Sequence, residues 1–143
     1  MILMSREEVI AEIDKINAYI KNCSWMDFEF CQMSFVQITL AGTIDEGSNE
    51  YAIDIEFEQP FFVSSLFLWG TDTSRPLIQL ATEEEERELE AIFHLGLGQN
   101  PSNYVFKIQA EHYGQTPTII IAKRVTCKIN REDPFRKQRG ASQ

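Results

Sequence analysis

The sequence predicts an α+β fold, with an antiparallel sheet of about five to six strands and two helices packed on one face. Two segments place apolar residues at helical spacing, and several others alternate apolar and polar residues with a period of two. A chain of 143 residues with 43% hydrophobic residues suits one core. No repeat or linker is visible, so we expect one domain over residues 1–129, in the order α-β-β-β-(β)-α-β-β, and a basic tail, flexible in solution, over residues 130–143.

The first helix begins with a capping-box pattern, Ser5 followed by Glu8. Apolar residues then recur on one side of a helix from about residue 6 to 21: Val9, Ile10, Ile13, Ile16 and Ile20. The other side is charged, as expected of a helix that lies on a core.

The period changes to two from Trp25 onward, which predicts strand. Met26, Phe28 and Phe30 share one parity, and Val36, Ile38 and Leu40 continue it farther on. Between them, Cys31, Met33 and Phe35 take the opposite parity. The chain therefore either bulges or bends between Cys31 and Phe35, or splits there into two strands.

The next strand follows a polar turn over residues 42–49. Tyr51, Ile53, Ile55 and Phe57 alternate with acidic residues, which gives the clearest strand pattern in the chain. Pro60 interrupts the pairing, and the apolar run over residues 61–69 predicts a buried strand.

A second helix is predicted after the loop over residues 70–76, because Thr82 and Glu85 repeat the capping-box pattern. Gly96, Gly98 and Pro101 end this helix. Two strands follow, near residues 104–110 and 119–129, joined by residues 112–117. We expect Lys123, Arg124 and Lys128 to lie on the final strand opposite acidic neighbours.

The charge is divided unevenly along the chain. Residues 1–122 carry six Lys and Arg against twenty Asp and Glu, whereas residues 123–143 carry seven against two. An acidic body repels nucleic-acid phosphates and anionic membranes but attracts basic proteins. We therefore expect a basic protein partner, with no nucleic acid and no membrane, although the acidity is also explained by solubility alone.

Several other classes are disfavoured. The apolar runs are too short for a membrane span, and no secretory leader precedes Ser5, so a soluble cytoplasmic protein is expected. Cys23, Cys31 and Cys127 match neither a disulfide framework nor a zinc site. We expect reduced thiols and predict no cofactor and no metal.

Carboxylates on the predicted strands form the candidate binding site. Asp27 and Glu29 alternate on one strand, and Asp54, Glu56 and Glu58 on another. If they join into one acidic face, aromatic residues at its rim provide anchors for a basic protein. The candidate partner-binding residues are Asp27, Glu29, Asp54, Glu56, Glu58, Trp25, Tyr51 and Trp69. The alternatives are a solvated strand whose charges pair with Lys107 or Lys123, and tryptophans that belong to the core.

Catalysis has weaker support in the sequence. His94 and His112 lie in no catalytic motif, and no local signature pairs either with a cysteine. We therefore predict that the protein is not an enzyme. A small enzyme or ligand-binding domain remains as an alternative, and it requires a pocket assembled from residues distant in sequence.

Small size, acidity and an expected cytosolic location make the chain similar in class to bacterial immunity proteins, which neutralise toxins. That similarity implies an inhibitor that covers the basic surface of a nuclease-like partner. The predicted element order also resembles that of acidic secretion chaperones, which implies a dimer that holds a client. The sequence leaves monomer and homodimer open.

Overall fold

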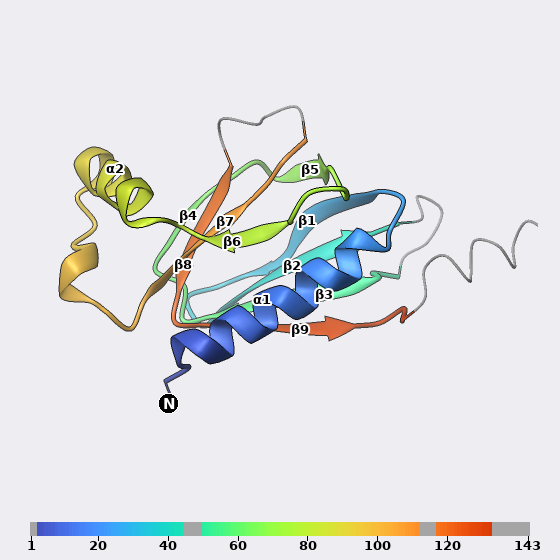
Figure 1. The fold of residues 1–143 in the computed structure, drawn as a ribbon, viewed down its shortest axis with the longest axis horizontal. Coiled ribbons are helices and arrows are strands. Elements are labelled where there is room, and N and C mark those ends of the chain that lie inside the picture. The colour runs from blue at the N-terminus through green and yellow to red at the C-terminus, as the bar shows by residue number, and fades with distance from the viewer. Residues whose placement is uncertain (1–2, 45–49, 112–116, 133–143) are drawn as a thin grey trace, which may run out of the picture.

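The computed structural model describes residues 3–44, 50–111 and 117–132, and over these ranges it confirms the α+β class (Figure 1). The structure has two helices and two antiparallel sheets rather than the single sheet of about five to six strands that was predicted. The predicted turn residues 45–49, the connection with His112, and tail residues 133–143 lie outside the described residues.

The five-stranded sheet has the order β5-β1-β2-β3-β9, and the four-stranded sheet the order β4-β8-β7-β6. In the described part of the chain, six strands lie between the two helices and three follow the second, whereas the sequence predicted three or four and then two. The elements are α1 (Arg6–Lys21), β1 (Met26–Met33), β2 (Gln37–Thr43), β3 (Ile53–Glu58), β4 (Phe62–Ser64), β5 (Leu68–Thr71), β6 (Ile78–Leu80), α2 (Glu83–Phe93), the 3-10 helix η1 (Leu97–Gln99), β7 (Tyr104–Ile108), β8 (Thr118–Ala122) and β9 (Arg124–Ile129).

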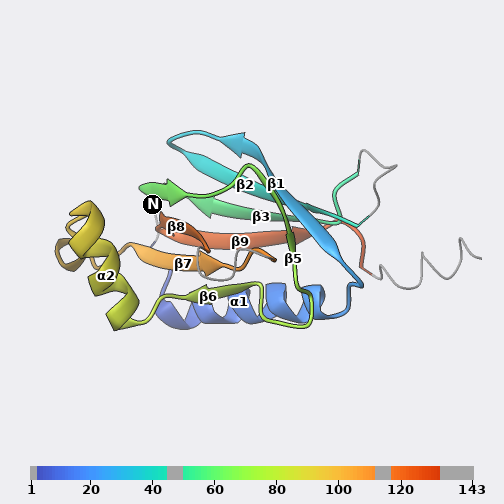
Figure 2. The same ribbon diagram turned by 90° about the horizontal axis from the view of Figure 1, so that it is seen from above.

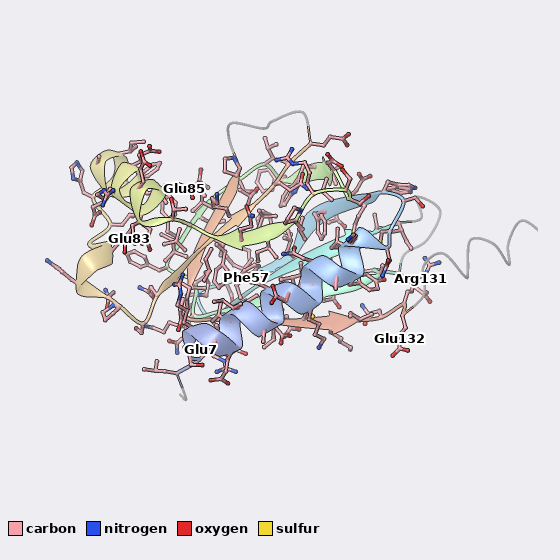
Figure 3. All side chains as sticks on the ribbon, in the orientation of Figure 1. Glu7, Phe57, Glu83, Glu85, Arg131 and Glu132 are labelled. Carbon is pink, nitrogen blue, oxygen red and sulfur yellow. The ribbon has the colours of Figure 1, made fainter. Side chains whose placement is uncertain are left out.

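The core lies where the two sheets face each other. Phe57 of β3 and Phe106 of β7 meet with ring centroids 5.2 Å apart, and both are fully buried. Figure 3 shows Phe57 near the centre of the molecule. The apolar residues that alternate along β1, β2 and β3 face this core, so the period of two read from the sequence identifies the buried side correctly.

Helix α1 closes one open side of this sandwich, between edge strands β9 and β6 (Figure 2). Its bounds match the predicted helix, and its Ser5–Glu8 capping box is present. Two polar side chains of α1 bond to the strand edges: Glu12 Oε1 accepts from Cys127 N at 3.0 Å, and Asn17 Oδ1 accepts from Leu77 N and Ile78 N. Asn17 Nδ2 also donates to Ile78 O at 2.9 Å. The helix therefore covers two edges that would otherwise be exposed.

Helix α2 lies elsewhere, so the prediction that both helices pack on one face is wrong. It rests on the outward side of the four-stranded sheet, where Phe93 meets Phe62 at 5.0 Å and Lys107 Nζ contacts Glu85 Oε2 at 2.6 Å. None of its residues is buried. A second sheet gives the chain a second apolar surface, and α2 covers only part of it.

The apolar run over residues 61–69 was interpreted as one buried strand, and that interpretation is wrong. It contains β4 of one sheet and the start of β5 of the other, with Ser65, Leu66 and Phe67 crossing between them. Because both are short edge strands, Phe61, Leu66, Phe67 and Leu68 remain exposed while Trp69 is buried.

The sequence left open whether the parity change near Cys31 reflects a bulge or a division into two strands, and the structure contains both. Phe30 pairs with Leu40 and Gln32 with Thr39, so Cys31 is the extra residue of a β-bulge. A turn at Ser34 then separates β1 from β2.

The start of the predicted tail is attached to the body. Asn130 N and Arg131 N both donate to Ala52 O, and Tyr19 Oη donates to Arg131 O. Within the described part of the chain, no helix is long and apolar enough to span a membrane.

Candidate functional site

The five predicted carboxylates lie on one side of the five-stranded sheet. Glu29 pairs with Ala41, Ala41 with Asp54, and Asp54 with Lys128, so these residues form one row across four strands. Neighbouring rows place Asp27, Glu56 and Glu58 on the same side, because directly paired residues project to the same side of a sheet. We call this side, defined by Asp27, Glu29, Asp54, Glu56 and Glu58, the acidic face.

The acidic face points away from the core. The residues that alternate with its carboxylates, such as Phe28, Ile55 and Phe57, are fully buried on the opposite side. All five carboxylate residues are half-buried. Between the two acidic strands, β2 contributes only uncharged residues: Gln37, Thr39, Ala41 and Thr43. The face therefore consists of two acidic strands separated by a neutral one.

Tyr51 connects the two acidic strands. It lies just before β3, and its hydroxyl donates to Glu29 Oε1 on β1, so the side chain crosses β2. This hydrogen bond, helped by partial burial and the negative charge of Glu29, raises the pKa of Tyr51 to about 12. Tyr51 therefore contacts the acidic face and holds one of its carboxylates in place.

Two cations from β9 share this face. Arg124 Nε contacts Glu58 Oε2 at 3.1 Å, and Lys128 lies opposite Asp54 in the register. The sequence correctly placed both on the final strand opposite acidic residues. Five carboxylates and two cations give the face a formal charge of −3.

The lysines suggested as partners of these carboxylates lie elsewhere. Lys107 contacts Glu85 of α2, and Lys123, between β8 and β9, donates to Ser102 Oγ at 2.9 Å. Glu56 lies between Thr39 and Thr126, two uncharged neighbours. The centre of the face is therefore more acidic than the edge formed by β9.

The two tryptophans differ in position. Trp69 is only 3% exposed and stacks on Phe28 with centroids 6.2 Å apart, so it is a core residue and not part of the rim. Its indole alternates to the buried side of β5. Trp25, directly before β1, is half-buried. Of the three predicted aromatic residues, Tyr51 alone is shown contacting a carboxylate of the face.

Leu68 is the apolar residue at this edge that sequence reasoning missed. It pairs with Glu29 across β5 and β1, on the side of the acidic face, and is 64% exposed. Because Leu68 is next to Trp69 in the strand, the two side chains project to opposite sides of the sheet. The continuous apolar run around them hid this alternation in the sequence. The acidic face therefore has an apolar border on β5 and a cationic border on β9.

Cys31, the extra residue of the bulge, is exposed. The charges of Asp54, Glu29 and Glu56 lie near enough to act on its thiol. Partial desolvation raises the pKa of its thiol, and the charges of Asp54, Glu29 and Glu56 raise it further. A raised pKa keeps a thiol protonated and unreactive at neutral pH. His94 caps the end of α2 in a left-handed conformation and is exposed.

The acidic side chains that the structure describes are spread too widely to form a metal site. Over residues 3–44, 50–111 and 117–132, no three His, Cys, Asp or Glu side chains come close enough to hold a metal ion. What the acidic face offers is a set of spaced carboxylates for ion pairs and charge-assisted hydrogen bonds, with exposed apolar surface at one border.

Comparison of the chain with protein-family models, with curated proteins and with solved structures found no match.

Proposed function

We propose that the protein is a non-enzymatic binding domain whose acidic face covers a basic surface of another protein. The observation that carries the proposal is the register: Asp27, Glu29, Asp54, Glu56 and Glu58 lie together on the side of the sheet that points away from the core. The net charge of −9 adds a negative electrostatic potential over the molecule as a whole. Such a field steers a basic partner into encounter.

The proposed mechanism is occlusion. A basic surface that binds nucleic acid presents Lys and Arg side chains at phosphate spacing, and spaced carboxylates can pair with several of them. Tyr51 fixes Glu29 in advance, which reduces the side-chain entropy lost on binding. Leu68 supplies apolar contact at the border. The partner is then shielded from its own target, which would make the protein an inhibitor of the immunity-protein type.

Charge reversal on the face tests this proposal. The variant Asp54→Lys with Glu56→Lys changes two residues of the acidic face, and its matched control, Glu7→Lys with Asp14→Lys, makes the same change of net charge on exposed positions of α1. Both variants should be checked for unchanged circular dichroism and thermal unfolding. They are then used beside the unaltered chain to capture proteins from source-cell lysate at low and moderate salt.

We expect the unaltered chain and the α1 control to capture one basic protein in a salt-sensitive 1:1 complex. The face variant should not capture it. With the partner purified, the face variant should bind about tenfold more slowly, and the unaltered chain should block the partner's activity. Equal association rates for both variants would remove the face from the mechanism. Two copies of the chain holding one extended client would instead indicate a chaperone.

A further inference from the structure

A second surface, separate from the acidic face, gathers at the end of the molecule that carries α2. There the β1–β2 hairpin, the β3–β4 connection and the corner between β8 and β9 come together (Figures 1 and 2). Four segments distant in sequence line a groove of about 390 Å³. Its lining residues are Phe35, Val36, Gln59, Pro60, Phe61, Asn100, Asn103 and Lys123.

One wall of this groove is apolar and exposed. Phe35 is 89% exposed at the hairpin tip, and Val36 and Phe61 are each more than half exposed. An aromatic side chain left in water at a groove wall forgoes the burial that would stabilise it. Two aromatic side chains and one valine around the groove therefore favour an apolar occupant.

The other wall is polar and cationic. Lys123 lines the groove, and its ammonium group donates to Ser102 Oγ at 2.9 Å. Gln59, Asn100 and Asn103 add side-chain amides, which are suited to both the donors and the acceptors of a peptide backbone. Asn103 Oδ1 is buried without a hydrogen-bond partner among the described residues.

The backbone at Gln59 supports a binding role for the groove. Gln59 has φ of 51°, in the left-handed region that non-glycine residues adopt at a cost, and its N–H donates to Val36 O at 2.9 Å. Strained backbone of this kind concentrates at ligand-binding sites. The hydrogen bond from Gln59 N to Val36 O joins the β3–β4 connection to the β1–β2 hairpin, and it thereby fixes two sides of the groove relative to each other.

A second cavity, of about 540 Å³, shares Asn100 and Asn103 with the groove. It continues toward Arg6, Glu83 and Glu86, at the start of α2. Together the two cavities, which have these asparagines in common, offer more room than one side chain needs, and charged residues of both signs line the second cavity. This shape suits a peptide segment rather than a single small molecule.

We propose that the groove binds the C-terminus of a protein that ends in a bulky apolar residue. Its terminal carboxylate pairs with Lys123, its last side chain lies against Phe35, Val36 and Phe61, and the preceding residues run past Asn100 and Asn103. Charge complementarity selects this occupant, because Lys123 is the one charged residue among those that line the groove, and it lies beside the apolar wall. The proposal concerns a different surface from the acidic face and does not depend on it.

Short peptides test the proposal. The probe is acetyl-Gly-Ser-Gly-Phe with a free carboxylate, and its matched controls are the same peptide with a C-terminal amide and acetyl-Gly-Ser-Gly-Gly with a free carboxylate. Binding is followed by two-dimensional amide NMR spectra of the full chain. We expect shifts at residues of the groove, and we expect amidation or loss of the phenyl ring each to weaken binding at least about fivefold.

Variants at two lysines make the test specific. Lys123→Gln should abolish the difference between the free and amidated peptides, Lys123→Arg should keep it, and Lys128→Gln, on the acidic face, should leave it unchanged. Equal binding of the free and amidated peptides would overturn the proposal, as would shifts confined to other surfaces. An amidated peptide with an internal Asp that binds as tightly as the free carboxylate would also overturn it, because the groove would then take internal acidic segments.

Discussion

The hydroxyl group of Tyr51 donates a hydrogen bond to Glu29 Oε1 at 2.5 Å, across the full width of β2. Tyr51 precedes β3 and Glu29 lies on β1, so this one contact joins the two acidic strands. The side chain of Tyr51 is half-buried. The bond therefore orders the acidic face on the surface of the sheet rather than in the core.

The Tyr51→Phe variant should remove this bond and lower the free energy of unfolding by about 1 kcal/mol at neutral pH. The sign of its pH dependence follows from the raised pKa. Tyr51 has a pKa of about 12 in the folded chain against about 10 when unfolded, so its contribution is complete below pH 10 and is lost as pH rises toward 12. Urea unfolding of both proteins over this pH range measures the difference.

Tyr19 provides an internal comparison, because burial raises its pKa to about 12 as well. In 13C spectra of ring-labelled tyrosine, both residues should titrate late in the unaltered chain. Tyr51→Phe should remove one late titration and leave that of Tyr19 in place. A Tyr51 resonance that titrates near pH 10 would contradict the hydrogen bond to Glu29.

Asn17 should be among the most sensitive polar residues. Its side chain meets Leu77 N, Ile78 N and Ile78 O at the edge of β6. Asn17→Ala leaves two donors and one acceptor without these partners, and we expect a loss of about 3 kcal/mol in chemical denaturation. Asn17→Asp retains the acceptor for both N–H groups and should cost less.

Asn22 is the matched control for Asn17. It lies at the end of the same helix, where its side chain is exposed and donates to Ala18 O at 3.3 Å. Asn22→Ala should change the free energy of unfolding by less than about 1 kcal/mol. Equal losses for Asn17→Ala and Asn22→Ala would show that α1 does not cover the β6 edge through Asn17.

Trp69 and Trp25 should respond differently to truncation. Trp69 stacks against Phe28 and Phe30 in the core, so Trp69→Ala should cost about 3–5 kcal/mol. Trp69→Phe should cost less, since the buried indole Nε1 has no hydrogen-bond partner among the described residues. Trp25→Ala, at a half-buried position, should cost less than Trp69→Ala, as measured by urea unfolding.

Loss of the two capping boxes should have different effects: one on global unfolding and the other on local opening of a helix. Ser5 caps α1, which is packed into the core, so Ser5→Ala should lower global stability by about 1 kcal/mol. Thr82 caps α2, which has no buried residue, so Thr82→Ala should instead open α2 locally. Amide hydrogen exchange distinguishes them: faster exchange confined to α2 is expected for Thr82→Ala, and α2 protection equal to that of the core would contradict it.

The sequence determined the local structure of this chain. Both helices begin at the predicted capping boxes, because a capping box is formed by residues three apart. The strand with Asp54, Glu56 and Glu58 buries its alternate residues as predicted, because the period of a strand is set by its own backbone. That same alternation placed the five carboxylates on strand faces that point outward.

Only the tertiary structure decided how those strands are grouped. No local pattern shows that the run around Phe67 crosses from one sheet to the other, or that α1 closes their open side through Glu12 and Asn17. The groove near Lys123 likewise joins four segments whose proximity depends on strand order. Alternation tells which side of a strand is buried, but strand pairing, a long-range choice, decides which residues become neighbours.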